Sequence, residues 1–211
     1  MKKKSMVDLI ADQLRTGEAH DSAWSVLLLM GEKRRRLITG RRLREILQAC
    51  DAIPDWLFDD CQSHVGDSAE TLALLWPQLK GSVPVQWIDA GLNAWIETIA
   101  TNPPLHWWME ELLPKLAVLE PQQQSAALLT IWGTLPDERH FLFNKLLTGG
   151  FRIGVARGLV VKAIAIGFSL EEALVLERLM APLEPSPSWF NALTAAPTTE
   201  RTNRGPVPYP F

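Results

Sequence analysis

Apolar residues recur at helical spacing along most of the chain, and Pro and Gly interrupt them at intervals. Over residues 42–49, for example, Leu43, Ile46 and Leu47 share one side of a helix, and charged residues occupy the other. No stretch has the alternation of a strand or a hairpin turn, and the β-branched residues near 160–168 lie within a helix-like pattern. We therefore predict an all-α fold, with helices over 6–14, 23–30, 42–49, a run starting at Pro54, 72–76 closed by Pro77, 85–100, 107–119, 122–132, 137–147, 155–166 and 170–180.

The chain divides into a helical part and a proline-rich part. Residues 1–181 carry the helical periodicity and are numerous enough to form one shared hydrophobic core. After Met180, seven prolines lie among Ser, Thr and Asn, a composition typical of extended linkers. We predict a single helical domain over 1–181 and a proline-rich linker over 182–211 that leads toward a C-terminal partner domain outside this chain.

The overall composition is that of an ordinary globular protein, with 47% hydrophobic and 21% charged residues. Nine tryptophans are many, but tryptophan mostly reports packing in cores and groove edges. Cys50 and Cys61 do not make a disulfide framework, and no stretch has the pattern of a secretion signal or a membrane span. We expect a cytoplasmic, monomeric protein without a membrane partner.

Positive charge is concentrated in one short segment. Between Lys33 and Arg44 there are seven basic residues and no acid, and removing these seven from the 21 basic residues leaves 14 against 24 acidic ones. The rest of the chain therefore carries a net charge near −10. Such concentration favours a polyanion partner, and arginine suits phosphate because its planar fork engages two oxygens at once. DNA, RNA, an anionic lipid surface and a simply solvated charge run all remain open at this point.

Thr39 and Gly40 separate the two arginine clusters of this segment. This pair is typical of a turn into a following helix, whose first backbone amides can receive a phosphate.

A second candidate site is a glycine-rich corner. Gly149, Gly150 and Gly154 surround Arg152 and lead into a helix that bears Arg157 and Lys162, and no acid occurs between Glu138 and Glu171. Glycine lacks the Cβ that keeps a backbone away from a sugar–phosphate chain, so main-chain N–H groups can approach closely. The alternative is a plain helix–turn–helix corner in which glycines end helices. The Gly-Lys-Ser/Thr ending of a nucleotide-binding P-loop is absent.

The segment Val65–Glu70 carries two carboxylates, Asp67 and Glu70, at the spacing of a capping box, although Asp replaces the usual Ser or Thr. Capping explains the pair better than a metal site with nearby His64 does. The cysteines and histidines have no zinc spacing and no hydrolase partner, so we predict no catalytic or metal-binding residue.

Four stretches together, in this order, resemble the N-terminal DNA-binding domain of ATP-dependent DNA ligases, in particular the bacterial branch whose genes lie beside a large helicase. The resemblance covers nearly the whole chain, and the most telling stretch is similar to the Leu-x-Gly-x-x-Arg-Ile-Gly corner of that family. The terminal Pro-Tyr-Pro-Phe resembles the lead-in to the adenylation domain. The four stretches are Arg34–Ile38, Ile53–Phe58, Val65–Leu75 and Phe143–Val155.

The resemblance implies an all-helical domain that lies across the minor groove at a nick and makes mostly backbone contacts. Adenylation and oligonucleotide-binding-fold domains complete the encirclement, and ATP and Mg²⁺ belong to them. Function would be sequence-nonspecific binding of nicked double-stranded DNA in repair, recombination and replication, near the bacterial nucleoid. The expected DNA-binding residues are Arg34, Arg35, Arg36, Thr39, Gly40, Arg41, Arg42, Gly149, Gly150, Arg152, Gly154, Arg157 and Lys162.

The chain departs from the ligase pattern in one respect. Ligases form a covalent Lys–AMP within a Lys-x-Asp-Gly motif, and none of the eight lysines here is followed by x-Asp-Gly. We therefore expect no cofactor in this chain and no ligation by it alone, as a fragment or as a product that has lost its catalytic half. The alternative function is a helical protein–protein scaffold whose basic patch meets an acidic partner.

Overall fold

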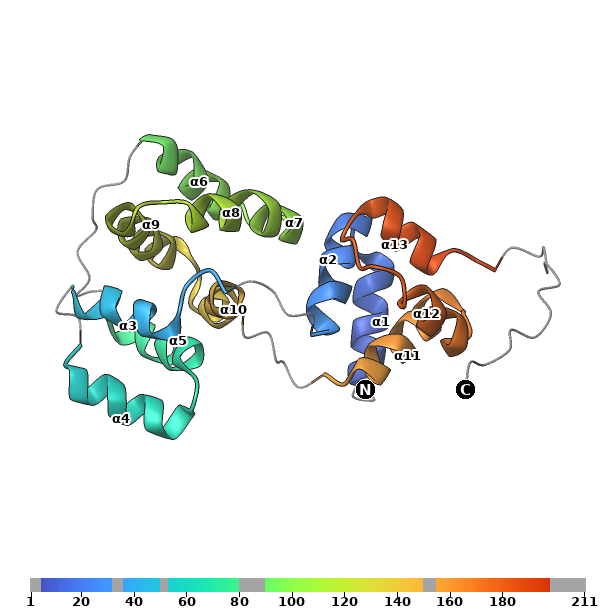
Figure 1. Ribbon diagram of the computed structural model, residues 1–211, viewed down its shortest axis with the longest axis horizontal. Coiled ribbons are helices and arrows are strands. Elements are labelled where there is room, and N and C mark those ends of the chain that lie inside the picture. Colours follow the sequence, from blue (N-terminus) through green and yellow to red (C-terminus); the bar gives the residue numbers. More distant parts are fainter. Residues whose placement is uncertain (1–4, 32–35, 50–52, 80–89, 150–154, 198–211) are drawn as a thin grey trace, which may run out of the picture. The chain divides into compact units, whose positions relative to one another are not determined.

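The computed structural model of the chain is helical throughout the residues that it describes, 5–31, 36–49, 53–79, 90–149 and 155–197 (Figure 1). Within these ranges no strand occurs, which confirms the all-α prediction. The helices are α1 (Met6–Thr16), α2 (Ala19–Leu29), α3 (Gly40–Gln48), α4 (Asp55–Val65), α5 (Ser68–Leu79), α6 (Ala90–Ala100), α7 (Leu105–Trp107), the π-helix η1 (Trp108–Leu112), α8 (Leu113–Ala117), α9 (Pro121–Thr134), α10 (Asp137–Thr148), α11 (Arg157–Phe168), α12 (Glu172–Arg178) and α13 (Pro187–Thr194).

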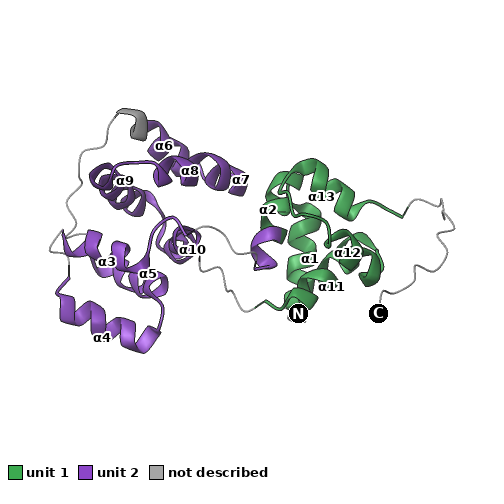
Figure 2. Ribbon diagram, in the orientation of Figure 1, with its two compact units in different colours: residues 1–26, 155–211 green, residues 27–154 purple. Residues whose placement is uncertain are grey.

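Contacts divide the chain into two compact units (Figure 2). Unit 1 comprises residues 1–26 and 155–211, and unit 2 comprises residues 27–154, so the division falls inside α2. The sequence predicted one domain with one shared core, whereas each unit has buried apolar residues of its own. Periodicity indicates which face of a helix is buried but not which distant helix covers it. Here α1 pairs with α11, although all of unit 2 lies between them in the sequence.

Unit 1 is built on the pairing of α1 with α11. The two helices approach so closely that a Cβ added at Gly167 would lie 3.2 Å from the carbonyl oxygen of Ala11. Glycine is therefore the residue that permits this approach. Buried Leu14, Val160 and Ile164 fill the remaining space with apolar side chains.

Helix α13 lies within the segment predicted as a linker. Ser186 caps it by accepting from the N–H of Trp189 at 3.2 Å, and Pro187 occupies the first turn, where a missing N–H costs nothing. Phe190 is buried and meets the Phe168 ring edge to face at 5.7 Å. Pro187 thus starts a helix here, and the apolar residues after it pack the helix against the rest of unit 1. Residues 198–211 of the predicted linker lie outside the described residues.

Unit 2 is organised around the pairing of α5 with α10 (Figure 1). Helices α3 and α4 pack on α5, and α6 and α8 pack on α9. Trp76 of α5 lies between Trp132 and His140, with ring centroids 5.6 Å and 5.3 Å apart respectively. All three are buried, so part of the tryptophan content is explained by one aromatic core.

Two prolines lie within helical segments. Pro77 was expected to close a helix, but α5 continues through it to Leu79, because Trp76 and Leu79 are buried and hold the last turn in place. Pro114 lies inside the predicted helix 107–119, and the five residues before α8 form η1. A proline ring clashes with the carbonyl one turn earlier, and the wider π-helix gives that ring room.

No helix in the described part of the chain combines the length and the apolar character needed to cross a membrane.

Candidate nucleic-acid interface

Residues 36–38 of the arginine-rich segment are hydrogen-bonded to the last turn of α10. The backbone N–H groups of Leu37 and Ile38 both donate to the carbonyl oxygen of Leu147, each at 3.1 Å. The Nε–H of exposed Arg36 donates to the carbonyl oxygen of Thr148 at 3.3 Å. A helix leaves its last carbonyls without partners of its own, and this segment supplies donors to them. The turn at Arg36 and the end of α10 are therefore neighbours within unit 2.

Gly149 follows directly and ends α10 in the left-handed conformation, with φ at 65°. A residue with a Cβ is strained in this conformation, so the first glycine of the predicted corner has a structural reason to be glycine. Five predicted residues of the two segments lie outside the described residues: Arg34, Arg35, Gly150, Arg152 and Gly154.

Thr39 and Gly40 form the start of α3. The Thr39 hydroxyl accepts from the N–H of Arg42 at 3.1 Å and caps the helix. A Cβ added at Gly40 would come within 2.6 Å of the Ser68 hydroxyl oxygen, at the start of α5. Thr39 thus starts α3, as the sequence predicted, whereas Gly40 permits α3 to pack closely on α5, which is a role that the sequence reasoning did not assign to it.

The arginines of α3 differ sharply in their surroundings. The side chain of Arg41 is 87% exposed, and its Nε donates to Glu45 at 2.9 Å one turn later. Arg42 reaches α9 instead, where its guanidinium donates to the carbonyl of Pro121 at 3.0 Å and to the hydroxyl of Ser125 at 2.8 Å. Arg41 is thus placed to meet an anion, whereas Arg42 joins two helices.

Arg44 also joins two helices. Its guanidinium makes a two-pronged ion pair with Asp59 of α4, including one contact of 2.9 Å, and lies over the ring of Phe58 at 5.6 Å. A charge run that looked uniform in sequence therefore contains both structural and exposed members.

Arg157 and Lys162 belong to unit 1, where both are exposed on α11.

The corner between α4 and α5 caps the start of α5, as predicted. Gly66 ends α4 at φ 79°, and Asp67 then accepts from the N–H of Glu70 at 3.0 Å. Asp67 also receives the ammonium of Lys145 at 2.6 Å, and Lys145 is almost wholly buried. Partial burial alone would raise the pKa of Asp67, but the hydrogen bonds from Lys145 and the N–H of Glu70 outweigh it and lower that pKa. Sequence reasoning missed Lys145, whose partner lies 78 residues away.

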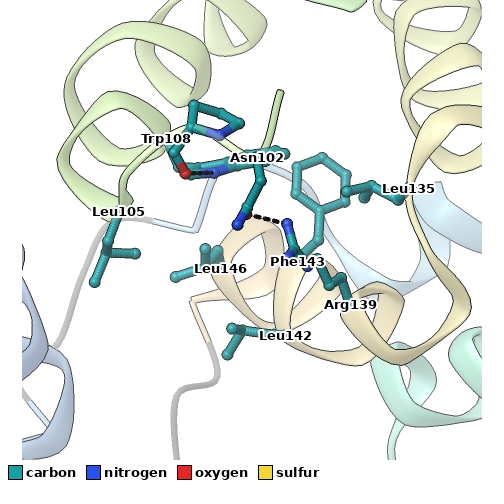
Figure 3. A pocket seen from close by; sticks show the side chains of 9 residues that line it. Asn102, Leu105, Trp108, Leu135, Arg139, Leu142, Phe143 and Leu146 are labelled. Carbon is teal, nitrogen blue, oxygen red and sulfur yellow. Dashed lines mark hydrogen bonds between the residues drawn. The ribbon is translucent and has the colours of Figure 1, made fainter. Parts of the chain in front are cut away.

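A mostly apolar pocket of about 210 Å³ lies between α10 and the turn that precedes α7 (Figure 3). The Trp108 indole N–H donates to the carbonyl of Pro103 at 3.2 Å, and Arg139 donates to the side-chain oxygen of Asn102. Asn102 has φ at 60°, so an unusual backbone turn forms one wall. The lining offers aromatic and aliphatic surface with two polar groups at its rim. The residues are Asn102, Pro103, Leu105, Trp108, Leu135, Arg139, Leu142, Phe143 and Leu146.

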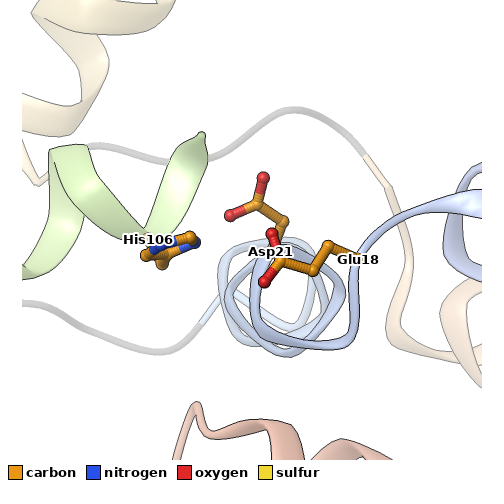
Figure 4. Close-up of side chains that lie close together, drawn as sticks. All are labelled: Glu18, Asp21 and His106. Atoms are coloured by element: carbon orange, nitrogen blue, oxygen red, sulfur yellow. The ribbon is translucent and has the colours of Figure 1, made fainter. Parts of the chain in front are cut away.

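Three possible metal ligands, Glu18, Asp21 and His106, are drawn in Figure 4. Glu18 and Asp21 belong to unit 1, where they lie at the start of α2. Their negative charges stabilise the positive N-terminal end of that helix. His106 belongs to α7 of unit 2.

The described residues are all-helical apart from their connecting loops, and exposed Arg36 adjoins the end of α10 at Gly149. The family described as DNA ligase N terminus matches residues 1–165, a range that includes all of unit 2 and most of α11. The chain belongs to this family of DNA ligase N-terminal domains. A search of the curated proteins and a search of the solved structures found no match to it.

Proposed function

We propose that this chain binds nicked duplex DNA without sequence preference, as the N-terminal clamp domain of an ATP-dependent DNA ligase. One observation carries the proposal. The hydrogen bond from Arg36 to the carbonyl of Thr148 brings the arginine turn beside the end of α10 and its Gly149. An exposed arginine and a helix end at a glycine, each of which suits a phosphate chain, thus occur together in unit 2.

The chemistry follows from the charge on these residues. The bond to Thr148 uses only the Nε of Arg36, and the two terminal amino groups of an arginine can engage phosphate oxygens as a fork. Arg41 adds a second exposed guanidinium on α3. Contacts of this kind release counterions and carry no base information, so binding depends on salt and not on sequence.

The rest of the ligase completes the proposal. Adenylation and oligonucleotide-binding-fold domains would close around the DNA, and ATP and Mg²⁺ would be held there. This chain has no Lys-x-Asp-Gly motif, so no nucleotidyl-transfer step is assigned to its residues. We place the protein as a monomer in the bacterial cytoplasm, at the nucleoid, in the branch associated with a helicase, with roles in repair, recombination and replication.

A titration of nicked duplex against the chain at several salt concentrations tests the proposal. We expect the logarithm of the binding constant to fall linearly with the logarithm of salt, equally for unrelated sequences. Arg41→Gln is expected to reduce this slope by about 0.9, the loss of one phosphate contact.

Lys115→Gln is the matched control, because Lys115 pairs with Glu111 at the same one-turn spacing at which Arg41 pairs with Glu45. This control should leave the slope unchanged. Equal binding of polyglutamate and DNA would instead favour a scaffold for acidic proteins. Absence of salt-sensitive binding to nicked duplex would remove the proposal.

A further inference from the structure

The last turn of α10 is held from two sides by polar contacts. On one side, Lys145 is 8% exposed and its ammonium lies 2.6 Å from the carboxylate of Asp67, at the start of α5. Fully buried Asn144 donates to the carbonyl of Ala69 at 3.2 Å and accepts from the indole N–H of Trp132 at 2.9 Å. Adjacent residues of α10 therefore attach the same turn to α5 and to α9.

On the other side, residues 36–38 are hydrogen-bonded to the end of the same helix. The Leu147 carbonyl accepts from two backbone N–H groups, and the Thr148 carbonyl accepts from Arg36. Arg36 is thus attached to a helix end that Asp67 and Lys145 fix in place. Any movement of that end changes where Arg36 is presented.

The ammonium of Lys145 forms an ion pair with Asp67. Lys145 lies in the last turn of α10, three residues before Thr148. Its ammonium faces the carboxylate of Asp67 and also lies over the ring of Phe141, 5.4 Å from the ring centroid. A buried ammonium in such a pair is not available to neutralise a phosphate.

We propose that Asp67 and Lys145 are positioning residues for DNA binding: their ion pair fixes the end of α10 and thereby the Arg36 turn, while neither side chain contacts DNA. The inference rests on the proposed function. It also gives a role to the Val65–Glu70 corner beyond capping, because the corner anchors the proposed interface.

The test separates affinity from salt dependence. Lys145→Met keeps the apolar stem, and Asp67→Asn keeps an oxygen that caps α5. Each variant is expected to bind nicked duplex about tenfold more weakly at every salt concentration, with a slope equal to that of the parent chain. Amide hydrogen exchange at Leu37 and Ile38 is expected to accelerate in both variants, since their acceptor is the Leu147 carbonyl.

The double variant Asp67→Asn/Lys145→Met guards against misfolding, because it leaves no unpaired buried charge. It is expected to fold, and to bind no more weakly than either single variant. A slope lowered by about 0.9 in Lys145→Met would make Lys145 a direct phosphate ligand and overturn the inference. Parental affinity in all three folded variants would also overturn it. If the parent chain itself lacks salt-sensitive binding, the proposed function has failed, whereas the hydrogen-exchange result still reports on the positioning contact.

Discussion

The two units join their central helices by different means. In unit 1, α1 meets α11 through Ala11 and Gly167, and the buried residues of these two helices are apolar. In unit 2, α10 meets α5 through buried Asn144, which donates to the carbonyl of Ala69, and through buried Lys145, which pairs with Asp67. The first pairing depends on close approach and the second on hydrogen bonds and one ion pair.

This difference has consequences for what each pairing specifies. Apolar contact is non-directional, so it stabilises the α1–α11 pair without fixing the ends of either helix. Buried polar groups must find particular partners, so they allow few alternative registers of α10 on α5. The directional pairing occurs in the unit that presents Arg36, where the exact place of a helix end matters most.

The largest effect is expected for loss of a shared buried hydrogen-bonding group in unit 2. Asn144→Ala leaves the indole N–H of Trp132 and the carbonyl of Ala69 without their partner. We expect a loss of about 3 kcal/mol in the free energy of unfolding by urea. Asn191→Ala, at an exposed position of α13, serves as control and should change it by less than about 0.5 kcal/mol. Equal losses in the two variants would contradict the polar account of unit 2.

A smaller effect is expected from crowding the helix contact in unit 1. Gly167→Val would press its Cβ against the backbone of Ala11, at a cost of about 2 kcal/mol in the free energy of unfolding. The same substitution at Gly158, on the same helix, meets nothing within 4 Å and should be close to neutral. Thermal unfolding of both variants measures the difference. Comparable melting temperatures would show that α1 and α11 do not depend on this contact.

The smallest effect concerns pH and should appear in unit 2. The pKa of Asp67 lies below its ordinary value of 3.8 in the folded chain. Its stabilising contribution is therefore complete above that value and is lost as pH falls through the lower, folded pKa. Because Asp67 is partly exposed, we expect only about 1 kcal/mol or less. Urea unfolding of the parent and Asp67→Asn between about pH 6 and about pH 2 measures this, and an equal acid loss in both would contradict it.

Much of the fold follows from sequence, because apolar residues at helical spacing identify a helix before its partner is known. The helices around 42–49, 122–132 and 137–147 were predicted to within a few residues. Prolines were harder, since their effect depends on what the neighbouring residues bury: α5 runs through Pro77, and α13 starts at Pro187.

The candidate site was predictable only in part. Charge and glycine content pointed to the segments around Arg36 and Gly149, which the structure brings together. The division among the α3 arginines was not predictable, because Arg42 and Arg44 find partners 83 and 15 residues away. Local sequence carries no information about such pairings. The DNA contacts themselves stay a prediction.

The chain passes from unit 1 into unit 2 and back again, and this order affects how the protein is made. On the ribosome, α1 emerges long before α11, so the first helix waits while the whole intervening unit is synthesised. Unit 2 is contiguous and can assemble first, which shortens the effective loop that α1 and α11 must close. Completion of unit 1 is thereby the late step, and it occurs only after the whole of unit 2 has been synthesised.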